Sequence, residues 1–251
     1  MALFKSAISF GLVHIPVKMN PVITNNDTTF NMLHKKCESR IKYQKYCPHC
    51  KEEVKQHDII KGYEYAVDEY ITMSEEDFEN IKTTNDKLIE IISFVDLDEI
   101  DPIYFERSYY LMTDAKNKAF GLFKNALKKQ NKVAIAKTVL GSKSYYVILR
   151  FGNNNIIMST LYYEEEIKEV EPLVSENYTK QEMDLAIKLI DSMTDKFKPD
   201  TYHDEYQNKL HEAIEQKIEG KEIKPVKQKK QRTINDLMTA LEESIKSNRT
   251  A

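Results

Sequence analysis

The stretch between residues 115 and 163 places the strongest limit on how this 251-residue chain can fold. Residues 115–131 predict an amphipathic helix, whose apolar face is formed by Ala119, Phe120, Leu122, Phe123, Ala126 and Leu127. Three short strand-like runs follow, over 133–139, 145–151 and 156–163, with glycine-containing turns between them. Such a run of strands forms an antiparallel meander, and closing it into a barrel removes the unpaired edges. We therefore predict an α+β fold with an antiparallel β-barrel core and C-terminal helices.

Further strands are predicted before this meander. Residues 6–17 alternate in polarity and predict one strand, which Pro16 ends. Residues 63–73 predict a hairpin, and residues 88–95 and 104–112 predict two more strands. Ser74 is followed three residues later by Asp77, a variant of the capping box that marks the start of a helix.

The chain after Pro172 has a helical pattern. Thr179 and Glu182 form a capping box, and an apolar stripe follows at Met183, Ala186, Ile187, Ile190, Met193 and Phe197. Pro199 breaks this helix, and a second helix runs over about 201–218 until Gly220 stops it. We expect a core over residues 1–220, with the helices over about 172–220, and a separate segment over 221–251.

All three cysteines lie in one stretch, residues 34–65. They form two knuckles, His34-x2-Cys37 and Cys47-x2-Cys50, and the alternating residues 40–46 between them predict one strand or a small hairpin. Four nitrogen and sulfur ligands in two close pairs suit tetrahedral zinc. The sequence therefore predicts a structural zinc site formed by His34, Cys37, Cys47 and Cys50.

Other interpretations of these residues stay open. The three cysteines are also compatible with ordinary buried thiols, and Cys47-x2-Cys50 alone with a redox pair. His49 and His57 are rivals of His34 for the place of the fourth ligand.

Charge is segregated along the chain. The formal net charge is only -3, but residues 115–150 carry nine Lys and Arg and no Asp or Glu, between two acidic stretches. This predicts one positive surface on an acidic body, suited to nucleic acid, although a solvated helix face is the simpler alternative. The candidate DNA-binding residues are Lys124, Lys128, Lys129, Lys132, Lys137, Lys143 and Arg150, with Arg40 and Lys42 from the cysteine-containing stretch.

The C-terminal segment begins with a basic linker over residues 221–232. Residues 233–246 follow, with an apolar stripe at Ile234, Leu237, Met238, Leu241 and Ile245. A helix of this length is marginal in water by itself, so we expect it to fold against a partner. The alternative is that it docks on the chain's own barrel.

Several classes of chemistry have no motif in this chain. It has no phosphate-cradling glycine loop, no Gly-x-Ser-x-Gly elbow and no His-Glu-x-x-His run. Carboxylates cluster over residues 96–101 and 164–166, but no nucleophile or base accompanies them, so we interpret the chain as a binding protein and not an enzyme. No apolar run is long enough to span a bilayer, and an odd cysteine count without a signal peptide points to the cytoplasm.

A series of short motifs follows one another over about residues 2–220: Ile8 to Lys18, Leu33-His34, Arg40-Ile41, Ile59 to Tyr65, Glu99 to Phe105, Phe197-x-Pro199 and Tyr202-x-Asp204. In these motifs and their order the chain resembles the bacterial Ku family, with His14 in place of a commoner Asn.

This resemblance implies a homodimeric ring around the ends of double-stranded DNA. It also implies a bridge related to a zinc ribbon over about residues 34–65, and a nucleoid-associated role in non-homologous end joining with an ATP-dependent DNA ligase. The stripe at Leu237, Met238 and Leu241 resembles the ligase-recruiting tail of that family. Two rival functions stay open: a zinc-ribbon transcription or RNA-binding factor, and a metal-dependent nuclease that uses the acidic clusters.

Overall fold

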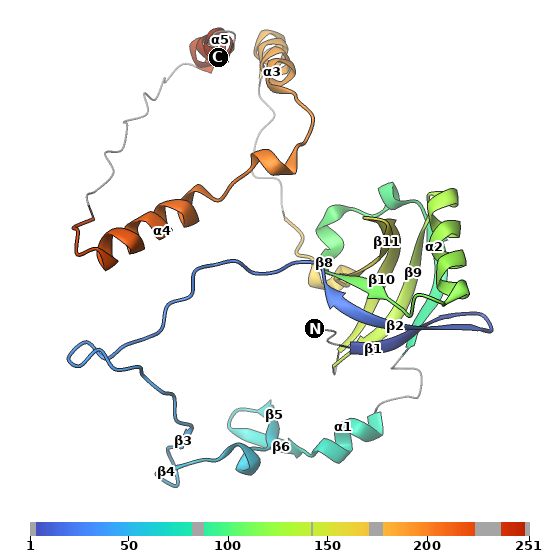
Figure 1. Ribbon diagram of the computed structural model, residues 1–251, viewed down its shortest axis with the longest axis vertical. Helices are drawn as coiled ribbons and strands as arrows, with labels where there is room; N and C mark the ends of the chain where they lie inside the picture. Colours follow the sequence, from blue (N-terminus) through green and yellow to red (C-terminus); the bar gives the residue numbers. More distant parts are fainter. Residues whose placement is uncertain (1–3, 82–87, 142, 171–177, 224–236, 249–251) are drawn as a thin grey trace. The chain divides into compact units, whose positions relative to one another are not determined.

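The unit Met1–Glu169 contains a closed β-barrel, seen in a computed structural model that describes residues 4–81, 88–141, 143–170, 178–223 and 237–248. Its seven strands follow one another around the wall in the order β1-β2-β8-β11-β10-β9-β7 (Figure 1). All neighbours are antiparallel except β1 and β7, which close the barrel as a parallel pair. The strands are β1 (Phe4–Phe10), β2 (Val13–Pro21), β7 (Leu88–Val95), β8 (Phe105–Met112), β9 (Val133–Leu140), β10 (Lys143–Gly152) and β11 (Asn155–Leu161).

The barrel interior is filled by alternate side chains from its strands, because successive residues of a strand point to opposite faces. Leu111, Leu149 and Met158 are fully buried there, and the buried side chains of helix α2 (Lys118–Gln130) belong to the same cluster. Asn117 caps this helix by accepting a hydrogen bond from the backbone N–H of Phe120, and Asn131 ends it in the left-handed conformation. The predicted barrel, helix and meander are therefore confirmed, although Leu122 is exposed and lies outside the buried face.

The prediction of one strand over residues 6–17 is wrong, since this stretch is the hairpin of β1 and β2. Gly11, with a φ of 57°, supplies the left-handed residue that the turn needs. Pro16 lies inside β2 opposite Ala7 and does not end it. A proline is tolerated there because β8 begins to pair with β2 only at Lys18, so the missing N–H removes no bond to β8.

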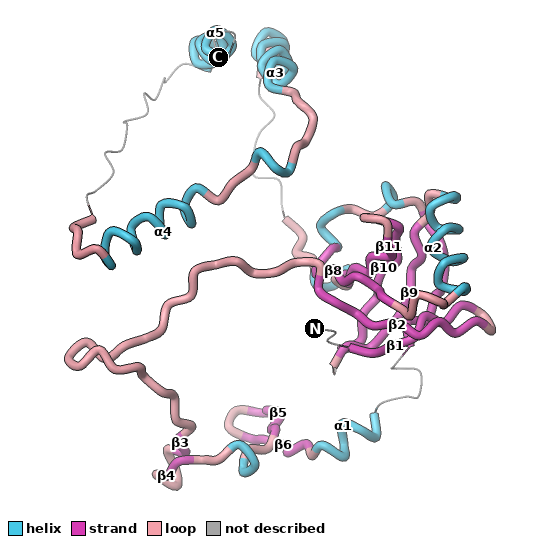
Figure 2. The backbone as a smooth tube through the Cα atoms, viewed as in Figure 1, coloured by secondary structure: helices cyan, strands magenta, loops and turns pink. Residues whose placement is uncertain are grey.

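Residues 22–81, here called the insertion, connect β2 to the segment before β7 and contain little regular structure (Figure 2). The predicted hairpin is confirmed as β5 (Lys61–Ala66) and β6 (Glu69–Met73), and helix α1 (Glu75–Ile81) follows it. Ser74 and Asp77 hold the start of α1 through reciprocal hydrogen bonds.

The predicted strand or hairpin over residues 40–46 of the insertion is not formed. Arg40 makes only an isolated bridge with Leu33, and the two-residue strands β3 (Tyr46–Cys47) and β4 (Glu52–Glu53) pair further along. Alternation of polarity does not suffice without a neighbouring strand to accept the backbone hydrogen bonds.

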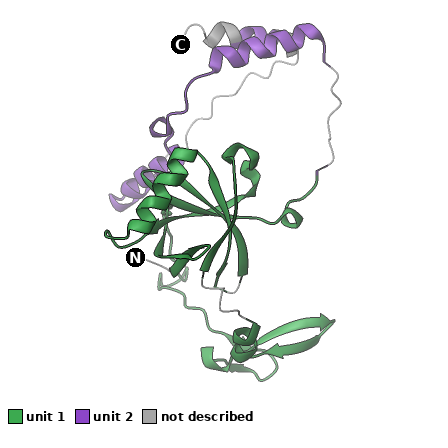
Figure 3. Cartoon of the chain, turned by 90° about the vertical axis from the view of Figure 1, so that its right-hand side faces the viewer, with its two compact units in different colours: residues 1–169 green, residues 170–251 purple. Residues whose placement is uncertain are grey.

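The described residues of the C-terminal unit, Val170–Ala251, include three α-helices (Figure 3). They are α3 (Lys180–Met193), α4 (Glu205–Ile218) and α5 (Leu237–Asn248). Thr179 and Glu182 form the predicted capping box, and Gly220, with a φ of 74°, follows the end of α4 as predicted.

Two helix boundaries in this unit differ from the prediction, and one of them is the start of α4, which lies at Glu205 and not at about residue 201. Helix α3 ends at Met193, before Pro199, and Phe197 lies beyond the helix with its ring stacked on Tyr202 at 5.5 Å. Most of the predicted basic linker and residues 233–236 of the tail lie outside the described residues. No helix in the described part of the chain is both long and apolar enough to cross a membrane.

Candidate nucleic-acid interface

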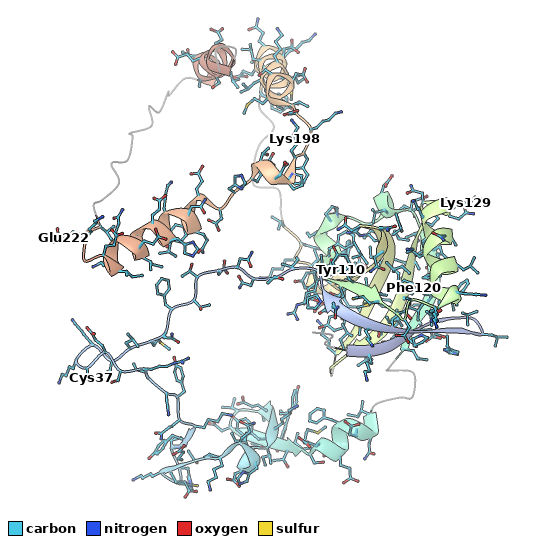
Figure 4. All side chains as sticks on the ribbon, viewed as in Figure 1. Cys37, Tyr110, Phe120, Lys129, Lys198 and Glu222 are labelled. Atoms are coloured by element: carbon cyan, nitrogen blue, oxygen red, sulfur yellow. The ribbon has the colours of Figure 1, made fainter. Side chains whose placement is uncertain are left out.

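Helix α2 carries three of the predicted DNA-binding lysines, Lys124, Lys128 and Lys129. Phe120, Phe123 and Leu127 form the face of the helix that packs on the barrel. The lysines lie outside this buried face, as Lys129 shows in Figure 4. Lys128 and Lys129 are exposed and Lys124 is half-buried. Lys124 donates only to the backbone oxygen of Asn154 at 3.4 Å. Among the described residues, these three ammonium groups form no ion pair with a carboxylate, so their charge is available to an anion outside the chain.

Two other predicted DNA-binding lysines are paired within the chain. The ammonium group of Lys132 lies 2.6 Å from a carboxylate oxygen of Asp96, and that of Lys143 lies 2.7 Å from Glu166. Hydrogen bonding to these carboxylates raises the pKa of both lysines. A phosphate at either lysine must therefore compete with a carboxylate that is already in place.

The remaining predicted cations occupy separate elements. Lys137 is exposed on β9, between Glu90 of β7 and Tyr146 of β10 in the register. Arg150 is half-buried on β10, and it lines one small cavity together with Lys128 and Lys132. The structure thus brings together cations from α2 and β10. Arg40 and Lys42 are exposed on the insertion.

The strand register brings two further cations together, which were not among the predicted DNA-binding residues. Lys5 of β1 lies directly opposite Lys18 of β2, and both side chains are exposed. Like charges in this arrangement destabilise a strand pair, and an anion outside the chain would relieve the repulsion. The sequence signal for this pair was hidden, because the hairpin that aligns the two lysines was predicted as one strand.

The predicted zinc ligands form two separate pairs in the structure. The Nδ1 of His34 lies 3.2 Å from the sulfur of Cys37, close to the roughly 3.5 Å that separates two ligands on one tetrahedral ion. The backbone N–H of Cys50 donates to the sulfur of Cys47 at 3.4 Å. His49 stands 4.0 Å from the Cys50 sulfur, whereas His57 pairs with Asp58.

The electrostatics of the knuckles favour the thiolate at Cys37 and Cys47 but not at Cys50. Hydrogen bonds from Ser39 and His34 lower the pKa of the Cys37 thiol to about 7, and the backbone N–H of Cys50 lowers that of Cys47. The neighbouring Cys47 raises the pKa of Cys50. The donor types and the geometry within each knuckle fit zinc. Over the described segments, however, no group of three or more His, Cys, Asp or Glu side chains is arranged so that it could hold a metal ion.

The acidic clusters mostly support local backbone structure. Asp96 and Glu99 form a capping box, and the carboxylate of Asp101 accepts a hydrogen bond from the backbone N–H of Ile103. Glu166 binds Lys143 and caps the turn that starts at Tyr163. These contacts give Asp96, Glu99, Asp101 and Glu166 a role in local structure.

The predicted ligase-recruiting residues lie on helix α5. This helix packs against α3, and the two run side by side in Figures 1 and 3. Leu241 is half-buried, as are Leu185 and Leu189 on α3. The side chains of Leu237 and Met238 lie outside the described residues.

Comparisons with known proteins agree with the barrel. The family model described as the Ku70/Ku80 beta-barrel domain matches residues 9–186. A protein of Lachnoclostridium phytofermentans is 42% identical over 247 residues, which cover 96% of this chain and 95% of that protein. A Bacillus subtilis protein is 37% identical, with 97% and 81% covered, and an Archaeoglobus fulgidus protein is 37% identical, with 88% and 90% covered. Each bears the name non-homologous end joining protein Ku. This confirms the resemblance found in the sequence: the chain belongs to the Ku family.

Proposed function

We propose that this protein binds the ends of double-stranded DNA in non-homologous end joining. The observation that carries the proposal is the set of lysines on α2 that pair with no carboxylate in the described part of the chain, on the barrel of a chain from this family. Relatives named for non-homologous end joining cover nearly the whole chain, which supports the same role here.

Binding is proposed to be independent of DNA sequence. Lys124, Lys128 and Lys129 present point charges, which neutralise phosphates and release counterions whatever the bases are. An acidic exterior elsewhere disfavours other contacts with DNA, so the basic surface selects where the duplex lies.

We further propose that two copies form a ring. The insertion exposes large apolar side chains, among them Phe30, Ile60 and Tyr63 at 67–69%. Exposed apolar surface of this extent marks an interaction site, and a second copy is the partner that the family resemblance implies.

A ligase is the proposed partner of α5. Because α5 packs on α3, the ligase must replace α3 on the face that includes Leu241 or bind the two helices together. Truncation after Gly220 tests this: the shortened chain should still dimerise and bind ends, with a shallower salt dependence, but should no longer stimulate its ligase. Leu237→Asp with Leu241→Asp should reproduce the ligation defect while leaving the basic linker. Loss of end binding on truncation would instead make the tail structural.

Zinc is proposed as the ion that joins the two knuckles. His34, Cys37, Cys47 and Cys50 supply the four donors, and the ion would act as a structural cross-link of the otherwise sparsely bonded insertion.

The end-binding proposal is tested by a mobility shift with linear and covalently closed DNA of the same sequence, with magnesium, followed by a product gel. We expect retention of linear duplexes alone, without cleavage. Equal binding of closed DNA, or preference for RNA, would favour a zinc-ribbon factor. Magnesium-dependent products would favour a nuclease.

A further inference from the structure

A cavity of about 520 Å³ opens on the outer face of the barrel wall. Ser108 of β8, Arg150 of β10 and Ser159 of β11 contribute to its lining. Their neighbours in sequence, Tyr109, Leu149 and Met158, belong to the interior core, so these three side chains point outwards. The segment over residues 97–105 lines the other side. The volume and the mainly apolar lining with a few polar groups are those of small-molecule sites.

The cationic group of this cavity is the guanidinium of Arg150. It is half-buried, and no hydrogen bond or ion pair with another described residue holds it. Gly152 makes room for it, because a Cβ at that position would lie 2.7 Å from an Arg150 guanidinium nitrogen. A guanidinium offers five donors in a planar fork that matches phosphate oxygens. Arg150 also lines the adjoining cavity of about 80 Å³, with Lys128 and Asn131.

The floor of the larger cavity offers an unused hydrogen-bond donor. The hydroxyls of Ser108 and Ser159 lie 2.8 Å apart, and Ser159 is only 2% exposed. One hydroxyl donates to the other, which leaves the second proton without an acceptor among the described residues. Across the cavity, the carboxylate of Asp98 provides an acceptor. A ligand that carries both donors and acceptors would satisfy the two sides.

The segment that faces the wall is held in place. Asp96 is bound to Lys132 at 2.6 Å, and its backbone N–H donates to Glu99 at 2.9 Å. At the other end, the backbone oxygen of Tyr104 accepts from the N–H of Tyr162 at 2.9 Å. A site fixed in this way needs little ordering when a ligand binds.

We propose that this cavity binds a nucleoside phosphate. Its phosphate would lie on Arg150 and Lys128, its planar base on the apolar side chains of Ile100 and Pro102, and its hydroxyl or amino groups near Asp98 and the serine pair. An inorganic anion alone would leave the apolar lining bare, and a neutral apolar ligand would bury Arg150 without a partner. A free nucleotide and the terminal nucleotide of a DNA strand share this chemistry. The site goes beyond the proposed duplex-end binding and does not rest on it.

Calorimetric titration of the full-length protein, without DNA, tests the proposal. Deoxyadenosine monophosphate should bind saturably, once per chain. Deoxyadenosine, which lacks the phosphate, and inorganic phosphate, which lacks the nucleoside, should each bind at least about tenfold more weakly. Arg150→Gln should lower the affinity for the nucleotide at least tenfold. The matched control is Arg107→Gln, since Arg107 is exposed, pairs with Glu106 at 3.4 Å and does not line the cavity.

Ser108→Ala provides a second variant that changes no charge. It should lower the affinity for the nucleotide several-fold, because it removes one of the two paired hydroxyls. The absence of saturable nucleotide binding, equal affinity for inorganic phosphate, or unchanged binding in both variants would overturn the proposal. A 5′-phosphorylated single strand that displaces the nucleotide identifies a DNA terminus as the source, and failure to displace it identifies a free nucleotide. Retention of duplex ends, measured separately in the absence of nucleotide, reports on the proposed function independently.

Discussion

The barrel keeps its apolar side chains inside a wall that one chain completes, whereas the insertion leaves its apolar side chains at the surface. Ile8, Leu111 and Leu149 are fully buried in the barrel, while Phe30 and Ile60 of the insertion are both 69% exposed. The barrel also closes its hydrogen-bonding edges, but much of the insertion has no neighbouring strand. The barrel therefore completes its apolar core within one chain, whereas the insertion leaves apolar surface that we propose a second copy covers.

Core truncation gives the largest expected contrast between the two regions. Leu149→Ala should lower the free energy of unfolding by about 2–5 kcal/mol, because it opens a cavity in a packed interior. Ile60→Ala should lower it by less than about 1 kcal/mol, because its side chain is already mostly in water. Urea unfolding across a dilution series measures both, and any loss of self-association in Ile60→Ala appears as a concentration dependence. Equal losses at all concentrations would show that the insertion packs within one chain.

Charge reversal on α2 tests whether the barrel also carries the DNA contacts. Replacing Lys124, Lys128 and Lys129 with Glu should weaken binding to all linear duplexes alike. If each lysine neutralises one phosphate, the slope of log affinity against log salt should become shallower by about 2 to 3. The matched control replaces three lysines of the C-terminal helices, Lys180, Lys188 and Lys209, with Glu as well, and should bind DNA as the parent protein does. Unchanged affinity in the α2 variant would assign these lysines to a solvated helix face.

Removal of metal should affect the insertion and spare the barrel. Elemental analysis should find one zinc per chain, and Cys47→Ser should lower that content because it removes a thiolate ligand. Limited proteolysis should then cut residues 22–81 faster, while the barrel's unfolding transition changes by less than about 1 kcal/mol.

The zinc content of single histidine variants identifies the fourth ligand. Loss of zinc in His34→Ala with retention in His49→Ala and His57→Ala would assign it to His34. Protein that contains no metal as purified, and does not respond to Cys47→Ser, would contradict the zinc proposal.

The same contrast explains which elements could be predicted from the sequence. Helix α2 and strands β9 to β11 were predicted because local periodicity and short turns specify them. The β1–β2 hairpin was missed because Pro16 suggested an end, although its N–H is not needed where β8 does not yet pair. In the insertion, the alternating residues 40–46 have the pattern of a strand, but of them Tyr46 alone lies in a strand, the short β3.

The candidate site was predictable in part for a similar reason. The α2 lysines follow from charge along the chain, which is local information. The pairing of Lys132 with Asp96, 36 residues away, and of Lys5 with Lys18 depends on long-range register, which no local pattern reveals. Arg150 was predicted as a DNA contact, but the cavity it lines depends on a segment that packs over the barrel wall.

The smallest expected effect separates function from stability within the barrel itself. Lys18→Glu replaces a like-charged cross-strand neighbour of Lys5 with an opposite charge, so it should raise the melting temperature by about 1–3 °C. The same change should weaken binding to DNA and make the salt slope shallower by up to about 0.9, if a phosphate normally lies on this pair. Lys18→Gln is the control, since it removes the repulsion without adding an attraction. Its melting temperature and its affinity for DNA should both lie between those of the parent protein and of Lys18→Glu. A more stable variant that binds DNA as well as the parent would place the lysine pair outside the DNA path. A gain in stability with a loss of binding would show that the barrel tolerates an unfavourable surface pair because DNA compensates its charge.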